Sequence, residues 1–477
     1  MGDGKKNHKK NNIHLPPFLL AIIDAFLVNA SFLFAFWLRF KGNVPEYNLD
    51  AFLEVFPWLS IAAVIIFGGL GTYERQRNGF INVLRSSLTG ITCIFIVTLA
   101  ITFWFRGFAF PRSVLLLGLF IQMIVIISWR FIYWYLEKRV HGVRNLLVVG
   151  PLDEVEKLLE KVLDSSQGWF KVNGVLDVSQ IDQLHHQLEE IDAVLLVPPL
   201  IKDRKASVLS TCQRAGCDIF LVPDFYDILL INTRMAQFDD LPVMEIQDMS
   251  LKGFQRVSKR IMDIAVSSLG LVLMLPVILI CALIIRLTSK GPVFYSQARV
   301  GKDQVVFRLL KFRTMIQDAE KKTGPVLASN NDPRITRIGN FLRITRLDEL
   351  PQLFNVLKGE MSLVGPRPER PVFVKHFERQ YSDYNYRHLV KPGITGLAQV
   401  AAKYTTSPGN KLKYELYYIR NYSLLMDFKI ILQTIPVLFN RESSAGTKDV
   451  SADKRAVIHS LVNNPYDNKN NNSSGGF

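Results

Sequence analysis

Four long apolar stretches near the N-terminus constrain the fold of this chain most strongly. They cover residues 17–40, 52–73, 84–105 and 113–136, and each is about 20 residues long or more. A helix needs about 20 apolar residues to cross the ~30 Å hydrocarbon core of a bilayer. The first stretch is too long for a cleavable signal peptide, and three more follow it. The sequence therefore predicts four transmembrane helices within residues 1–140.

The charges between these stretches predict their orientation. Lysines and arginines are more frequent before the first stretch, between the second and third, and after the fourth than in the other two loops. Basic loops tend to stay in the cytoplasm, so we expect the N-terminus and everything after Arg139 on that side. Asp24 is an acid inside the first stretch, for which a polar contact between helices is favoured over a functional role.

The composition narrows the class of the 477-residue chain. Hydrophobic residues make up 49 % and charged residues 21 %, and the net charge is +15. Such a charge suits a membrane surface or phosphate-rich substrates. No nucleic acid partner is expected, because the charge gathers beside the membrane stretches and around one acidic pair. The four cysteines are too few and too scattered for a disulfide framework or a zinc site, which favours a reducing cytoplasm.

Residues 141–250 show short apolar runs that alternate with helical patterns, as is typical of a parallel α/β sheet. The first run ends at Gly150, where a dinucleotide-binding fold would carry Gly-x-Gly-x-x-Gly. Only one glycine is present, and Asp153 and Glu154 would repel a pyrophosphate. Asp177 has the placement of a ribose-binding acid but follows no glycine turn. We predict a degenerate Rossmann-like domain of structural or regulatory role that does not bind NAD.

A fifth apolar run covers residues 266–285, and two interpretations are open for it. It could span the membrane, but its flanks are basic on both sides and Pro276 lies in its middle. Proline bends a helix, and a spanning helix should show a charge asymmetry. We therefore favour a re-entrant helix over residues 260–287, which enters and leaves by the cytoplasmic face.

Cationic side chains surround the adjacent carboxylates of Asp348 and Glu349 in the segment that follows. Guanidinium groups form rigid forks that suit phosphate oxygens, and two carboxylates can serve Mg²⁺ binding, nucleophilic attack or base catalysis. Glycine-proline turns nearby would let backbone N–H groups approach an anion. Ion pairs on a solvated surface are the alternative. The cations are Lys311, Arg334, Arg337, Arg343, Arg346 and Arg367.

The motifs at residues 311–315, 332–343, 345–352, 359–369 and 391–400 resemble those of the bacterial sugar transferases, which are monotopic polyprenyl-phosphate phosphoglycosyl transferases. The resemblance is specific over residues 254–441. The preceding helices and α/β domain resemble the long members, which transfer glucose- or galactose-1-phosphate. The resemblance implies an α/β membrane protein with a catalytic domain at residues 251–441. Residues 442–477 are polar and are predicted to be disordered.

The resemblance also implies a reaction. A UDP-sugar would donate its sugar-1-phosphate to undecaprenyl phosphate with release of UMP, as the first membrane step of exopolysaccharide, O-antigen or capsule synthesis. Asp348 would be the nucleophile that forms a covalent phosphosugar intermediate. Glu349 would assist the metal or the incoming lipid phosphate, and both carboxylates would bind Mg²⁺. The long members further imply a homodimer in the bacterial inner membrane, with the active site on the cytoplasmic face.

Other residues are assigned by the same motifs. Three positions depart from the family pattern. Leu275 replaces the serine before Pro276, Lys403 replaces an arginine and cannot form its bidentate phosphate contact, and Glu415 replaces an aspartate. The structural positions are Lys259, Arg260, Asp263 and Pro276. The substrate-binding positions are Lys311, Arg343, Arg367, Lys403, Glu415 and Asp427.

Alternatives to this function remain at the level of sequence. One is a membrane-anchored nucleotide-sugar oxidoreductase built on the middle domain, which the missing glycine turn disfavours. The other is a non-enzymatic scaffold of polysaccharide export. The sugar stays open between glucose and galactose, because no residue reports the stereochemistry at C4. Residues 414–439 read either as an amphipathic helix on the membrane or as a core helix.

Overall fold

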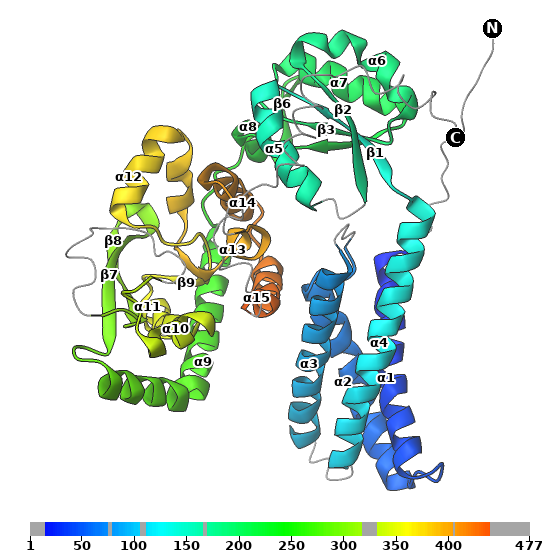
Figure 1. Ribbon diagram of the computed structural model, residues 1–477, viewed down its shortest axis with the longest axis vertical. Helices are drawn as coiled ribbons and strands as arrows, with labels where there is room; N and C mark the ends of the chain where they lie inside the picture. The colour runs from blue at the N-terminus through cyan, green and yellow to red at the C-terminus, as the bar shows by residue number, and fades with distance from the viewer. Residues whose placement is uncertain are drawn as a thin grey trace, which may run out of the picture. The chain divides into compact units, whose positions relative to one another are not determined.

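The computed structural model of the protein describes residues 15–74, 79–104, 111–165, 169–316, 332–403 and 406–438. The chain divides into two compact units, one up to Asp224 and one from Phe225, and Figure 1 shows the elements of both. The predicted tail at residues 442–477 and the lysines before the first apolar stretch lie outside the described residues.

The apolar stretches near the N-terminus form long helices that run side by side (Figure 1). Each is long and apolar enough to cross a membrane. Glycine lets neighbours approach closely: a Cβ on Gly90 would lie 2.4 Å from the Phe67 ring, and one on Gly118 would lie 2.7 Å from Phe32. The helices are α1 (Pro17–Arg39), α2 (Glu46–Gly69), α3 (Phe80–Trp104) and α4 (Arg112–His141).

A buried ion pair joins two of these helices. Arg130 on α4 donates a hydrogen bond to the Asp24 carboxylate on α1, and both side chains are almost fully buried. Arg130 also donates to Thr72 Oγ1 at 3.0 Å. Asp24 therefore makes the contact between helices that its position predicted, and the fourth apolar stretch supplies its counter-charge.

The middle of the chain forms a four-stranded parallel sheet in the order β2-β1-β3-β4. Alternate residues of β1 enter two different cores: Leu147 and Val149 pack in one, Leu146 and Val148 in the other. Both faces are thus covered, as in doubly wound folds. The strands are β1 (Arg144–Val149), β2 (Phe170–Leu176), β3 (Ala193–Leu196) and β4 (Asp218–Leu221), and the helices are α5 (Leu152–Ser165), η1 (Val178–Gln183), α6 (Leu184–Gln187), η2 (Leu188–Glu190) and α7 (Lys202–Ala215).

Two residues of the degenerate fingerprint have structural roles in this sheet. A Cβ on Gly150 would lie 2.7 Å from the Val197 carbonyl oxygen, so the glycine lets the ends of β1 and β3 meet. The Asp177 carboxylate accepts a hydrogen bond from the Ser179 N–H at 3.0 Å and caps η1. Both positions are explained without a nucleotide.

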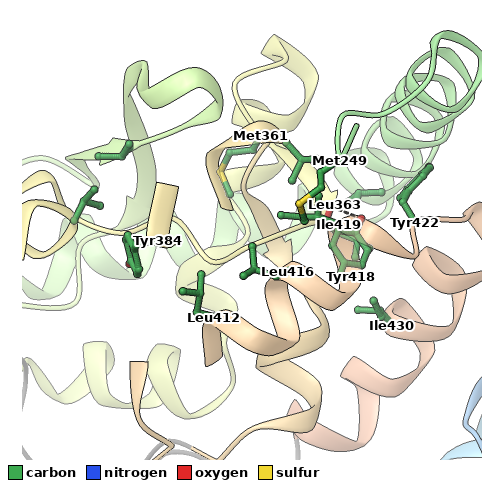
Figure 2. Close-up of a cluster of buried hydrophobic side chains, with 14 of the residues drawn as sticks. Met249, Met361, Leu363, Tyr384, Leu412, Leu416, Tyr418, Ile419, Tyr422 and Ile430 are labelled. Carbon is green, nitrogen blue, oxygen red and sulfur yellow. Dashed lines mark hydrogen bonds between the residues drawn. The ribbon is translucent and has the colours of Figure 1, made fainter. Parts of the chain in front are cut away.

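Residues 225–250, which the sequence analysis placed in the middle domain, belong by their contacts to the compact unit that begins at Phe225. Residues 225–250 form α8 (Phe225–Leu230) and the hairpin of β5 (Arg234–Phe238) and β6 (Leu241–Glu245). Figure 2 shows Met249 among Met361, Leu363 and Ile419 of the second unit's core. Arg420 also donates to the Ile231 and Gln247 carbonyls. These long-range contacts, which local sequence patterns do not report, assign the segment to the C-terminal unit.

The rest of the C-terminal unit mixes helices with two short sheets. A β7–β8 hairpin is antiparallel, and β9 pairs with β10 in parallel. Its elements are α9 (Gly253–Thr288), β7 (Phe294–Val300), η3 (Lys302–Gln304), β8 (Val306–Phe312), α10 (Arg337–Ile344), η4 (Leu347–Glu349), α11 (Gln352–Lys358), β9 (Ser362–Val364), α12 (Pro371–Gln380), η5 (Tyr384–Leu389), β10 (Gly393–Thr395), α13 (Leu397–Ala401), α14 (Pro408–Arg420) and α15 (Leu424–Leu438).

Helix α9 carries the fifth apolar run and returns to its own domain. Its 36 residues would extend about 54 Å if straight, yet both halves pack on the same unit. Asp263 in the first half contacts β9, while Ile278 and Ile285 in the second half pack with Phe312. Figure 1 shows the helix turning along its length, and Pro276 lies between the two halves. The structure keeps α9 as one helix that contains Pro276, so a bend in the helix takes the place of the predicted break.

We expect the free energy of unfolding to depend on pH because His388 is buried. Burial and the Arg387 charge lower the pKa of His388 to about 4. Between about pH 6.5 and about pH 4 the unfolded chain binds a proton at this histidine and the folded chain does not. Lowering the pH through that range therefore reduces the unfolding free energy by about 3 kcal/mol. We expect His388→Gln to flatten the loss of unfolding free energy over that range in detergent. His376→Gln, at an exposed site on α12, is the control, and an unchanged slope in His388→Gln would contradict the assignment.

Candidate active site

Asp348 and Glu349 lie on the tight turn η4 between α10 and α11. Arg346 just before them adopts a left-handed conformation, with φ of 58°, which is uncommon for a residue with a side chain. Leu347 and Leu350 pack against the apolar cluster that contains Ile285 of α9. The apolar residues anchor the turn, and the carboxylates between them meet the surrounding cations.

Asp348 and Glu349 have pKa values shifted in opposite directions, because the nearby lysine and arginine lie closer to Glu349. Lys311 Nζ of β8 lies 2.8 Å from Glu349 Oε1, and Arg367 Nη2 lies 3.7 Å from the same oxygen. Burial alone would raise the pKa of Glu349, but these two cations outweigh it and lower that pKa. Burial and the neighbouring Glu349 charge raise the pKa of Asp348, which is only 7 % exposed. Glu349 therefore stays ionised, while Asp348 is a poorly solvated carboxyl group.

Arg343 reaches this site from α10. Its Nε donates to Thr314 Oγ1 at 2.9 Å. Burial lowers the pKa of Arg343, and the Asp348 charge opposes this. The contact requires α10 to lie on the end of β8, and Gly339 allows it: a Cβ there would lie 2.0 Å from the Thr314 carbonyl oxygen. Residues 311–315 thus supply the ammonium for Glu349 and the anchor for Arg343.

The two glycine-rich motifs pack against each other rather than around an open site. A Cβ on Gly365 would lie 2.4 Å from the Lys391 carbonyl oxygen, and one on Gly396 would lie 2.1 Å from the Gly365 carbonyl oxygen. The Gly365 N–H donates to Thr395 O, and the Gly393 N–H donates to Pro366 O. These two N–H groups are occupied, which corrects the expectation that the turns present them to an anion. What the turns do is place Arg367 beside Glu349.

Three predicted structural residues fasten α9 to the domain. Arg260 donates to the carbonyls of Val356 and Leu357 at 2.6 and 2.7 Å, at the C-terminal end of α11. Asp263 accepts from the Leu363 N–H at 2.9 Å. Lys259 forms the third contact, with α15.

Asp427 is the partner of Lys259, and it lies inside the protein. The Lys259 Nζ is 2.7 Å from the Asp427 Oδ2, and the Tyr418 hydroxyl donates to Oδ1 at 2.6 Å. Asp427 is 0 % exposed. The sequence analysis predicted that Asp427 binds substrate. In the structure it lies in a buried network between α9 and α15.

The remaining candidates are dispersed. Lys403 is exposed after α13, where its N–H donates to Thr406. Glu415 is buried in contact with Arg387, a residue that the motif analysis did not single out. Arg334 pairs with Asp332 at 2.6 Å. The site itself is therefore formed by Asp348, Glu349, Lys311, Arg343 and Arg367.

The donor set of this site suits Mg²⁺. Mg²⁺ in proteins commonly takes one or two carboxylates together with substrate phosphates and water, and Asp348 and Glu349 supply two carboxylates. Within the part of the chain that the structure describes, no cluster of three or more acidic, histidine or cysteine side chains offers a cage made of protein ligands alone. Such a cation would depend on the substrate phosphates for its remaining ligands.

Comparisons with known proteins identify the family of this chain. The family model described as bacterial sugar transferase matches residues 254–441. A UDP-glucose:undecaprenyl-phosphate glucose-1-phosphate transferase of Klebsiella pneumoniae is 31 % identical over 411 residues, which cover 79 % of this chain and 87 % of that protein. The chain belongs to the bacterial sugar transferase family. The resemblance inferred from the motifs is confirmed.

Two further relatives match over about half of this chain. A UDP-N-acetylgalactosamine-undecaprenyl-phosphate N-acetylgalactosaminephosphotransferase of Aeromonas hydrophila is 40 % identical, over 48 % of this chain and 53 % of its own length. An undecaprenyl-phosphate galactose phosphotransferase of Salmonella typhimurium is 35 % identical, over 47 % and 50 %. The chain spans about half the length of these two relatives.

Proposed function

We propose that this protein transfers a hexose 1-phosphate from a UDP-sugar to undecaprenyl phosphate and releases UMP. The observation that carries the proposal is the pair of buried Asp348 and half-buried Glu349, with Lys311 and Arg367 close to the Glu349 carboxylate. Lys311 and Arg367 offer charge to a diphosphate, and the names of the three relatives describe transfers of this kind.

In the proposed mechanism Asp348 attacks the β-phosphorus of the donor. The bond to the bridging oxygen breaks, UMP leaves, and the sugar phosphate stays on the Asp348 carboxylate as an acyl phosphate. An oxygen of undecaprenyl phosphate then attacks the same phosphorus and releases Asp348. Poor solvation of Asp348 favours its role as nucleophile, and Glu349 keeps Lys311 and Arg367 in place.

Asp348 and Glu349 are the residues that would hold Mg²⁺. When bound, the ion would neutralise charge on the diphosphate. Arg343 would add a further cation on the Asp348 side of the site.

UMP release tests the reaction. The detergent-purified protein with Mg²⁺ and undecaprenyl phosphate should release UMP with one of UDP-glucose, UDP-galactose, UDP-N-acetylglucosamine and UDP-N-acetylgalactosamine. UDP-glucose is the first choice, because the Klebsiella relative matches over most of its length. Asp177→Asn should retain wild-type release, because Asp177 caps η1 in the α/β domain. No release with any UDP-sugar from folded protein would contradict the proposed function.

We propose further that α9 is re-entrant and that the site faces the cytoplasm of the inner membrane. In a cysteine-free background, Lys252→Cys and Lys290→Cys flank α9 on its two sides. Both should react with a membrane-impermeant maleimide from the cytoplasmic side only, because both ends of the helix are held by one domain. Asn43→Cys, between α1 and α2, should react from the opposite side. Labelling of Lys290→Cys from that opposite side would show a spanning helix instead.

The homodimer stays a prediction, which the mass of the detergent-solubilised protein tests.

A further inference from the structure

A buried ion pair lies behind the candidate active site. Arg387 of η5 donates to both carboxylate oxygens of Glu415 on α14, from Nε at 2.8 Å and from Nη2 at 2.8 Å. Arg387 is 4 % exposed and Glu415 is 6 % exposed. The hydroxyl of Tyr384 accepts a bond from Arg387 Nη1, and Tyr384 belongs to the same buried cluster as Leu412 and Leu416 of α14 (Figure 2). The pair therefore borders a buried apolar cluster.

The same ion pair holds the main chain of Arg367 at both of its polar groups. The Arg367 N–H donates to Glu415 Oε1 at 3.3 Å, and Arg387 Nη2 donates to the Arg367 carbonyl oxygen at 2.7 Å. The Arg367 side chain leaves this clamp 46 % exposed, with its guanidinium 3.7 Å from Glu349. One backbone is thus fixed while its side chain is directed to the site.

We propose that Arg387 and Glu415 are positioning residues that act through Arg367. Arg367 lies three residues beyond the end of β9, a strand of only three residues, and the backbone bonds to β10 reach no further than Pro366. Desolvating two charges is costly and seldom adds stability over an apolar pair. A pair that fixes both backbone groups of one residue instead secures the direction of that residue's guanidinium. Glu415 therefore acts on the substrate site indirectly, through the position of Arg367. This proposal rests on the proposed function only because its test measures turnover.

A double-mutant cycle on turnover tests this inference. Glu415→Gln keeps the side-chain shape and removes the charge that binds Arg387. We expect it to reduce kcat/KM for the UDP-sugar by about 10- to 100-fold, since small misplacements of a substrate-binding group have such effects. In an Arg367→Ala background the same substitution should cause no further loss, because the group it positions is gone. Losses that multiply in the double variant would overturn the proposal.

Two further variants separate positioning from stability. Arg420→Lys alters another buried arginine near α14's end that binds the Ile231 and Gln247 carbonyls, so it should lower the melting temperature without any coupling to Arg367→Ala. If Glu415→Gln does not fold, Tyr384→Phe removes only the hydroxyl bound to Arg387. Its smaller loss of kcat/KM should likewise vanish in the Arg367→Ala background. Wild-type protein without turnover would reject the proposed function, whereas turnover with multiplying losses would reject only the positioning role.

Discussion

Asp348→Asn is expected to lower UMP release by at least about 10³-fold, because an amide cannot replace a carboxylate as the attacking nucleophile. The isosteric change keeps the η4 turn, whose anchors are Leu347 and Leu350. The measurement is UMP release with each UDP-sugar, together with capture of the sugar phosphate on the protein. Wild-type protein given a radiolabelled UDP-sugar without acceptor should retain label after denaturation, and Asp348→Asn should retain none.

Two comparisons make this result specific. Glu349→Gln should lose turnover while Asp348 is still present, since Lys311 and Arg367 then lack the charge that holds them. Asp177→Asn, in the α/β domain, should release UMP and retain label like the wild type. Wild-type turnover by Asp348→Asn would exclude Asp348 as the nucleophile, and label retained by that variant would move the covalent bond to another residue.

Lys259→Met is expected to destabilise the C-terminal unit by about 3–5 kcal/mol. It leaves the fully buried Asp427 carboxylate without its cation, and an unpaired buried charge carries a cost of this order. The measurement is unfolding by heat and by denaturant in one detergent, followed through the tryptophan and tyrosine signals. UMP release at low temperature should fall with the folded fraction.

The matched control is an exposed pair of the same chemistry. Lys157 and Glu154 on α5 also lie 2.8 Å apart, but both are largely exposed. Lys157→Met should therefore change stability little. Adding Asp427→Leu to Lys259→Met should recover part of the loss, because no charge is then left unpaired. Equal effects of Lys259→Met and Lys157→Met would show that the buried network does not hold α9.

The acidic pair and the apolar helices could be predicted from the sequence because they are local properties. Hydropathy over about 20 residues predicts a helix that can enter a membrane, and each stretch does so whatever it packs against. Asp348 and Glu349 are adjacent in the chain, so one turn presents both. The parallel sheet was likewise readable from alternating runs, since its strands and helices are each continuous in sequence.

The partners of these residues were decided by the tertiary structure. Asp24 and Arg130 lie 106 positions apart, and only the packing of α1 against α4 brings them together. Glu415 and Asp427 bear the charge of substrate-binding residues, yet both are buried behind the site by α14 and α15. Arg387 belongs to no motif that pointed to it, because its partner Glu415 lies 28 positions further along the chain.

The glycines illustrate the same division. Gly365, Gly393 and Gly396 were recognisable in sequence as turn residues that permit a close approach. What approaches them could not be deduced, because a missing Cβ accommodates an anion and a second backbone equally well. The sequence by itself determined the membrane helices, the sheet and the acidic pair, which depend on neighbours along the chain. Pairing of distant charges and backbones, which depends on neighbours in space, was decided only by the folded structure.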